Sequence, residues 1–309
     1  MQTISKKIVS LLLAMLILAS TGVVAFADAI YDDADENFDT YISLGADLSK
    51  SQKEKVLDLL GVDEDDLDEF ITVTTTNDEE YQYLGDYLSK SVIGKNALSS
   101  VLVVKQKEGH GIHVQTHNIS YCTSGMYENA LVTAGITDAE VVVAAPMKIS
   151  GTAALVGVMK AYSAMTGETM KEENVDTATN ELVVSGELAE KISDPNRIEQ
   201  LIAMIKQKIS EGKLETDDEI KEAIVESAKI LEIELSDEDI EKLLDLMKKF
   251  ASLDLDWSTI QTQLEGIYDQ VSKMGVDTND QGLWNAISKF FTGIWDSISD
   301  FFAGLFGQK

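Results

Sequence analysis

Three histidines within eight residues are the side chains of this chain best suited to metal chemistry: His110, His113 and His117. Imidazole is the commonest protein ligand of transition metals. On a strand, His113 and His117 would share a face while His110 lies in a turn, and an acidic neighbour such as Glu108 would supply a carboxylate. The spacing matches neither the CxxC nor the HExxH pattern of known zinc scaffolds. The sequence therefore predicts no stoichiometric metal and no other cofactor, with these histidines as the candidate ligands.

Cys122 and Ser150 are the candidate nucleophiles, and either would need a base such as His117 to become reactive. Neither lies in a nucleophile elbow, and Ser150 and Thr152 sit where a predicted strand gives way to a helix, a place where hydroxyls cap free amides. Cys122 is the single cysteine, so no intrachain disulfide forms, and its thiol is interpreted as a small buried apolar group. These observations favour a non-enzymatic protein.

The strands that would position these residues belong to a predicted α/β (or α+β) domain over residues 41–167. Two of the strands are predicted to pair as a hairpin across residues 108–111, because Gly109 and Gly111 permit the positive φ angles of a tight turn. The predicted strands, rich in β-branched and apolar residues, cover 70–76, 101–107, 112–119 and 140–145.

Helices alternate with these strands and begin at recognisable capping residues. The pairs Ser49 with Gln52 and Asn77 with Glu80 predict two helix starts in the α/β domain. An all-α helical region is then predicted over residues 178–274, a small bundle of amphipathic helices. Its helix starts are predicted at Asp194 followed by Pro195, at the capping box of Thr216 with Glu219, and at Ser236 with Asp239.

The first 27 residues predict an export signal. Lys6 and Lys7 precede an apolar run that is too short to span a bilayer, and Ala25-Phe26-Ala27 fits a signal-peptidase site. Removing them takes away two lysines and no acids, which leaves 23 basic and 54 acidic residues and a net charge of −31. Such a surface repels nucleic acid. Residues 28–40 are interpreted as a solvated acidic leader. The predicted location is secreted or extracellular, with association at the cell envelope.

The C-terminus carries an unusual aromatic pattern. Residues 275–282 predict a polar hinge, and residues 283–309 predict a terminal amphipathic helix with one intensely apolar face. Charged residues on the other face argue against a spanning helix and favour one that lies on a membrane or binds a partner. The residues of this face are Trp284, Ile287, Phe291, Ile294, Trp295, Ile298, Phe301, Phe302 and Leu305.

Several short motifs, in order along the chain, resemble those of the YpuA-like family of secreted proteins (domain of unknown function 1002). They are Leu44-Gly45-Ala46-Asp47-Leu48, Tyr83-Leu84-Gly85 after Glu80, Thr116-His117-Asn118-Ile119, Ala145-Pro146 and Ser150-Gly151-Thr152-Ala153-Ala154-Leu155. The resemblance covers most of the chain after the signal. It implies export from a Gram-positive cell, and it brings no known activity or site residues.

The combined hypothesis is a secreted, envelope-associated, non-enzymatic binding or interaction protein. Its partner would be an envelope component, a membrane surface or another protein, reached through the C-terminal helix, and not a nucleic acid. The alternative is an extracellular hydrolase or metal-dependent enzyme that uses His117 with Cys122 or Ser150.

Overall fold

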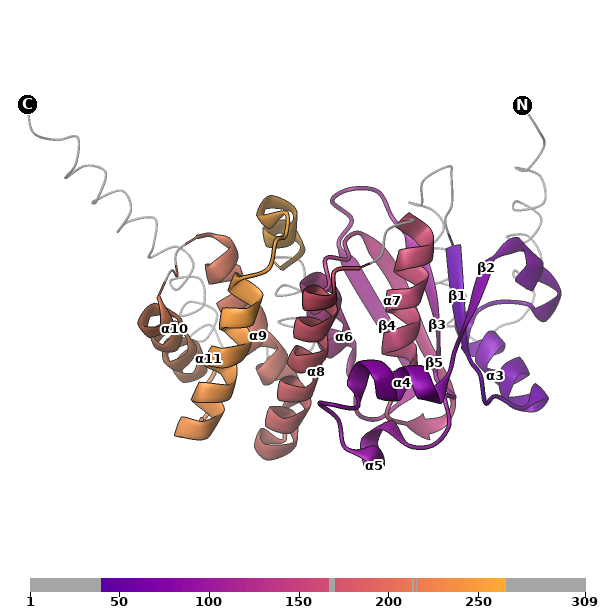
Figure 1. Cartoon of the computed structure of the whole chain (residues 1–309), viewed down its shortest axis with the longest axis horizontal. Helices are drawn as coiled ribbons and strands as arrows, with labels where there is room; N and C mark the ends of the chain where they lie inside the picture. Colours follow the sequence, from indigo (N-terminus) through magenta and orange to yellow (C-terminus); the bar gives the residue numbers. More distant parts are fainter. Residues whose placement is uncertain (1–39, 167–169, 213, 215, 265–309) are drawn as a thin grey trace, which may run out of the picture.

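A mixed five-stranded sheet forms the centre of the computed structural model, which describes residues 40–166, 170–212, 214 and 216–264 (Figure 1). The strand order is β2-β1-β3-β5-β4, and β3 runs antiparallel to its neighbours β1 and β5, whereas β1 pairs with β2 and β5 with β4 in parallel. The strands are β1 (Thr40–Gly45), β2 (Ile71–Thr75), β3 (Ser100–Lys105), β4 (Ile112–Ile119) and β5 (Ala139–Ile149).

The predicted hairpin between the strands near 101–107 and 112–119 is wrong, because β5 lies between β3 and β4. The strand β5 carries an unbroken run of buried residues from Ala139 to Pro146, and a strand buried on both faces is stabilised by a neighbour on each side. The strand β4 is half-exposed and takes the edge. Gly109 and Gly111 do adopt positive φ angles of 87° and 89°, but their loop crosses the end of β5 instead of closing a hairpin.

Alternating side chains divide the sheet between two helical layers. Ile42, Leu102 and Val142 pack with the helix α3 (Lys50–Leu60) on one face. Their neighbours Val101 and Val141 point to the opposite face. That face is covered by α6 (Ser124–Thr133) and α7 (Thr152–Thr166), and α4 (Asn77–Leu84) packs on α7. The short helices η2 (Glu64–Glu69) and α5 (Lys90–Ile93) complete this part.

Capping boxes set several of the predicted helix starts. Ser49, Thr216 and Ser236 each exchange hydrogen bonds with the residue three positions later, as a capping box requires. The prediction for Asn77 is one residue late, because Thr76 is the N-cap and Glu79 its partner. Glu80 is thereby freed to turn inward, where it accepts a hydrogen bond of 2.6 Å from the Thr152 hydroxyl.

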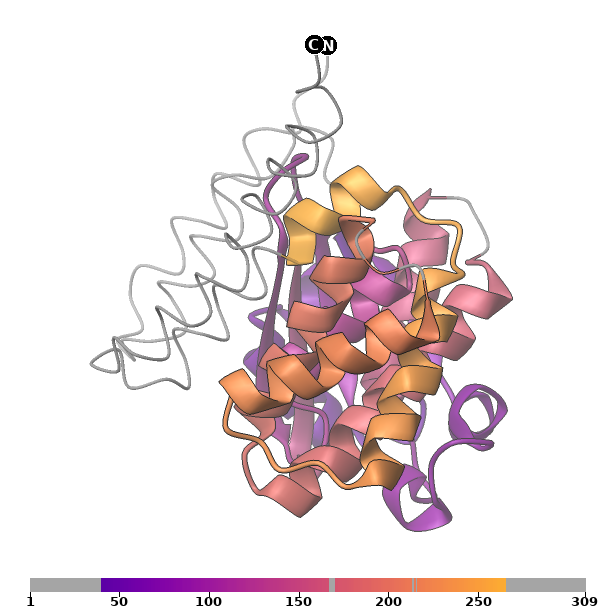
Figure 2. The same cartoon turned by 90° about the vertical axis from the view of Figure 1, so that its left-hand side faces the viewer.

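The second half of the chain is helical, as predicted. Its helices are α8 (Glu172–Ile192), α9 (Pro195–Ser210), α10 (Asp217–Ile230) and α11 (Asp237–Ala251), and residues 257–264 are also helical. Figure 2 looks onto this part, with the sheet behind it. One apolar cluster contains Val141 of the sheet, Leu182 of α8 and Leu243 of α11. The sheet and the helical part therefore share one core.

The predicted signal peptide, residues 28–39 of the acidic leader, the hinge and the aromatic face of residues 283–309 lie outside the described residues. Among the residues that are described, no helix combines the length and the apolar character needed to cross a bilayer.

Candidate metal centre

The loop that carries His110 is held by one buried carboxylate, that of Asp138. Its Oδ1 accepts hydrogen bonds of 3.0 Å from the backbone amides of Gly109 and Gly111, on either side of His110. Asp138 directly precedes β5 and has a φ of 51°, a left-handed conformation that aspartate tolerates better than most residues. Gly109 and Gly111, the two neighbours of His110, are therefore hydrogen-bonded to the residue that directly precedes β5.

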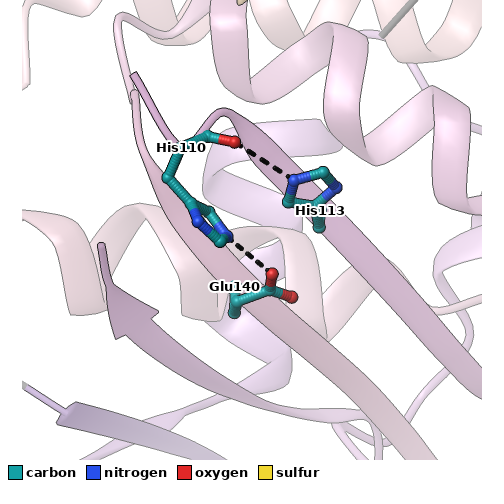
Figure 3. Close-up of side chains that lie close together, drawn as sticks. All are labelled: His110, His113 and Glu140. Carbon is teal, nitrogen blue, oxygen red and sulfur yellow. Dashed lines mark hydrogen bonds and ion pairs between the residues drawn. The ribbon is translucent and has the colours of Figure 1, made fainter. Parts of the chain in front are cut away.

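Figure 3 shows the His110 ring pointing to Glu140 and the His113 ring pointing to the His110 carbonyl oxygen. His113 on β4 and Glu140 on β5 are register partners, so their side chains leave the sheet on the same face. The Nε2 atom of His110 lies 2.7 Å from Oε1 of Glu140, and the Nε2 atom of His113 lies 3.2 Å from the His110 carbonyl oxygen. The two imidazole rings meet edge to face with centroids 4.9 Å apart.

The donor atoms of these three residues fit a divalent transition metal. One ligand atom from each of His110, His113 and Glu140 lies within 4.8 Å of the other two. Two imidazoles and a carboxylate are a donor set that zinc accepts in proteins. The Nε2 atom of His113 is hydrogen-bonded to the His110 carbonyl oxygen, and a metal bound to this nitrogen would replace that contact.

Glu140 also carries an unsatisfied oxygen. Only 8% of the residue is exposed, and its Oε2 is buried without a hydrogen-bond partner among the described residues. A buried carboxylate oxygen without a partner is costly, and a bound cation would relieve that cost. Among the described residues, the Glu140 carboxylate is contacted by the His110 ring through Oε1 alone.

The structure separates His117 from this group. His117 lies four residues beyond His113 on β4, about 13 Å along the strand, and pairs in register with Ala144. The two histidines do share a face, as the sequence indicates, but distance keeps His117 out of the cluster. Burial lowers the pKa of His117, so the ring is mainly neutral near pH 7.

The sequence suggested Glu108 as the acidic neighbour, whereas the structure brings Glu140 to the histidines and leaves Glu108 exposed. Glu140 and the loop-holding Asp138 were missed because both lie some thirty residues from His110 in the chain. A signal was nevertheless present. An acidic residue directly before an apolar run such as Val141-Val142-Val143 must become buried, and a buried carboxylate needs a partner.

Another buried carboxylate, Glu128 on α6, lies behind the strand β4. Its Oε1 accepts a 3.0 Å hydrogen bond from the Val114 amide on the free edge of that strand. Burial raises the pKa of Glu128 to about 8, and the nearby carboxylates of Glu199 and Glu140 add to the rise. Glu128 is therefore mostly protonated near pH 7, and it adds little negative charge beside the strand.

The candidate nucleophiles show no sign of activation. Cys122 is buried in the core, and burial raises the pKa of its thiol to about 12, which keeps it protonated. Ser150 and Thr152 place their hydroxyl oxygens 3.2 Å apart. No hydrogen bond among the described residues joins His117 to Cys122 or to Ser150, so a catalytic pair on His117 has no support in the geometry.

Comparison with known proteins identifies the family of this chain but assigns it no activity. The curated proteins include the uncharacterized protein YpuA of Bacillus subtilis (strain 168), which is 38% identical over 301 residues, covering 93% of this chain and 99% of that protein. No solved structure gives a significant match. The profile of the family described as "Protein of unknown function (DUF1002)" matches residues 44–267. The chain therefore belongs to the DUF1002 family.

Proposed function

We propose that this protein is an exported, non-enzymatic binding protein whose ligand is a divalent transition-metal ion such as zinc, which departs from the sequence-based prediction of no stoichiometric metal. The observation that carries the proposal is the convergence of His110, His113 and Glu140, with donor atoms within 4.8 Å of one another. The rigid loop held by Asp138 supports it, because a site that is already in place loses little entropy when the metal binds.

Export from the cell and association with the envelope are part of the same proposal. Their support is the signal-like segment at residues 1–27 and the apolar pattern of residues 283–309. The strongly acidic composition supports the metal-binding part of the proposal, since the net charge of −31 on the exported chain, from 23 basic and 54 acidic residues, draws cations toward the molecule.

The test is a zinc titration of the chain from residue 28 to 309, by calorimetry and by competition with a chromophoric chelator. We expect one zinc ion per chain. His113→Ala and His110→Ala should each lower the affinity by more than the roughly 10- to 100-fold that loss of an outer-sphere partner costs.

His117→Ala is the matched control, because His117 lies on the same face of the same strand but outside the group. It should bind zinc as the parent chain does. Absence of zinc binding by the parent chain, or equal losses in all three variants, would refute a defined metal centre. Urea unfolding of each metal-free variant separates loss of a ligand from loss of the fold.

A further inference from the structure

We propose that the side-chain oxygen of Gln263 is the fourth ligand of this centre, so that the bound metal has no open position for substrate. The inference rests on the proposed metal-binding function and goes beyond it, because it decides between a closed binding site and a catalytic one. Closed zinc sites have four protein ligands, whereas catalytic sites have three and a water.

The helical residues 257–264 bring Gln263 to the site. The Asp256 side chain accepts hydrogen bonds from the backbone of Ser258 and Thr259 and so caps this helix. Trp257 packs edge to face on Phe250 of α11, with ring centroids 5.5 Å apart. The helix is therefore anchored at its first turn, and Gln263 itself is 1% exposed.

The hydrogen bond between Gln263 and Asp138 determines which end of the Gln263 amide faces the metal centre. Its Nε2 donates a 3.0 Å hydrogen bond to Oδ1 of Asp138, and an ionised carboxylate only accepts. The amide oxygen Oε1 therefore points away from Asp138. It is buried, and it has no hydrogen-bond partner among the described residues.

The unpartnered Oε1 atom of Gln263 and the His113 ring both lie close to Gly111. A Cβ atom placed on Gly111 would lie 3.8 Å from Nε2 of His113 and 3.9 Å from Oε1 of Gln263. The helix that holds Gln263 is the last coloured segment in Figure 2, beside the sheet edge that carries the loop. A neutral amide oxygen completes two imidazoles and a carboxylate without adding charge.

The Asp138 carboxylate thus joins the two halves of the centre. The same Oδ1 atom accepts from the two glycine amides around His110 and from the Gln263 side chain. Second-sphere partners of this kind orient the ligands of a metal. Four ligands would then surround one ion. They come from the loop (His110), from the strands β4 and β5 (His113 and Glu140) and from the last described helix (Gln263).

The experiment compares two substitutions in the chain from residue 28 to 309 loaded with cobalt(II), whose visible absorption is strong when four-coordinate and weak when water completes six positions. Gln263→Met removes both the oxygen ligand and the donor to Asp138. Gln263→Glu removes the donor but keeps an oxygen at the same distance. Thr262→Ala, on the same helix and exposed, is the control.

We expect a four-coordinate spectrum for the parent chain, the control and Gln263→Glu. Gln263→Met should give a water-coordinated spectrum and weaken binding by more than the roughly 10- to 100-fold that loss of an outer-sphere partner costs. If Gln263→Met leaves spectrum and affinity unchanged, or if Met and Glu weaken binding equally, Gln263 is not a ligand. A parent chain that binds neither zinc nor cobalt would instead refute the proposed function, which keeps the two failures distinct.

Discussion

The ammonium group of Lys206 on α9 lies 3.0 Å from the carboxylate of Glu181 on α8, and both side chains are buried. Lys206 also donates to the Asn129 carbonyl oxygen at 2.7 Å, and Thr133 donates to Glu181, so that the pair ties α8 and α9 to α6 of the sheet layer. Burial lowers the pKa of Lys206 and raises that of Glu181, while each charge stabilises the other.

Breaking this pair should destabilise the whole molecule. Lys206→Ala leaves the Glu181 carboxylate buried without its partner, which costs about 3 to 5 kcal/mol for a buried pair. Urea unfolding measures the loss. Lys221→Ala is the control, because Lys221 pairs with Glu241 at the surface, where water solvates both charges, and its unfolding midpoint should barely move. Equal midpoints for the two variants would contradict a structural role for the buried pair.

Stability of the metal-free protein should fall as the pH rises from about 5 to 8. Burial raises the pKa of Glu199 from 4.5 to about 7, so the folded state holds a proton that the unfolded state has released. That stabilisation is complete below about pH 4.5 and is lost as the pH rises through 7, with a total on the order of 3 kcal/mol.

Glu199→Gln should make this pH profile less steep, because a neutral amide stands in for the protonated acid and still accepts from Thr123. The profile should keep a slope, because burial raises the pKa of Glu128 to about 8 and that group still titrates. Urea unfolding at pH 5, 6, 7 and 8 in the presence of a chelator provides the measurement. Glu79→Gln serves as control, since the pKa of Glu79 is lowered and that group titrates below this range. A parent profile that is level, or that rises with pH, would contradict the assignment.

The Asp138 carboxylate should control metal affinity without touching the metal. Asp138→Ala frees the amides of Gly109 and Gly111, so His110 loses its fixed position and zinc affinity should fall roughly 10- to 100-fold. Glu108→Ala removes an exposed acid from the same loop and should leave the affinity unchanged. A loss for Glu108 equal to that for Asp138 would point to general electrostatic attraction instead of loop geometry.

Cys122 should be unreactive in the native protein. The residue is buried and the pKa of its thiol is raised to about 12, so the thiolate that reacts with disulfide reagents is scarce and shielded. We expect no labelling by a chromogenic disulfide in buffer and one thiol per chain in denaturant. Cys122→Ser should leave zinc binding intact. Rapid labelling of the native protein would revive a nucleophilic role.

The aromatic C-terminal segment should bind lipid bilayers. Burial of each Trp or Phe side chain contributes roughly 1.5 to 3 kcal/mol, and Gly293 and Gly304 weaken the isolated helix, so folding and binding should be coupled. Liposome co-sedimentation should show binding by the chain from residue 28 to 309 and none by a version ending at Asp280. Added salt should preserve binding to anionic vesicles because it screens the repulsion by the acidic protein. Equal sedimentation of the two versions would argue for a packed or protein-binding segment.

Local sequence patterns were sufficient to predict most elements of this fold. The capping residues Ser49, Thr216 and Ser236 predicted helix starts correctly, because a capping box involves only residues three positions apart. Apolar runs predicted the strands β2, β3, β4 and β5, because strand patterns also involve only near neighbours in the chain, but β1 was not among the predicted strands. Family membership also followed from the sequence, from ordered motifs that the family profile bears out.

Strand order and the candidate centre depended on contacts between distant segments, which local patterns do not encode. The sequence predicted β3 next to β4, but β5 is the more deeply buried strand and takes the place between them. That insertion puts Glu140 in register with His113 and Asp138 beside the loop of His110. Three histidines in eight residues were visible in the sequence alone. Only the tertiary structure decided that two of them meet a carboxylate while the third lies too far along its strand, because pairing in a sheet joins residues by register and not by distance along the chain.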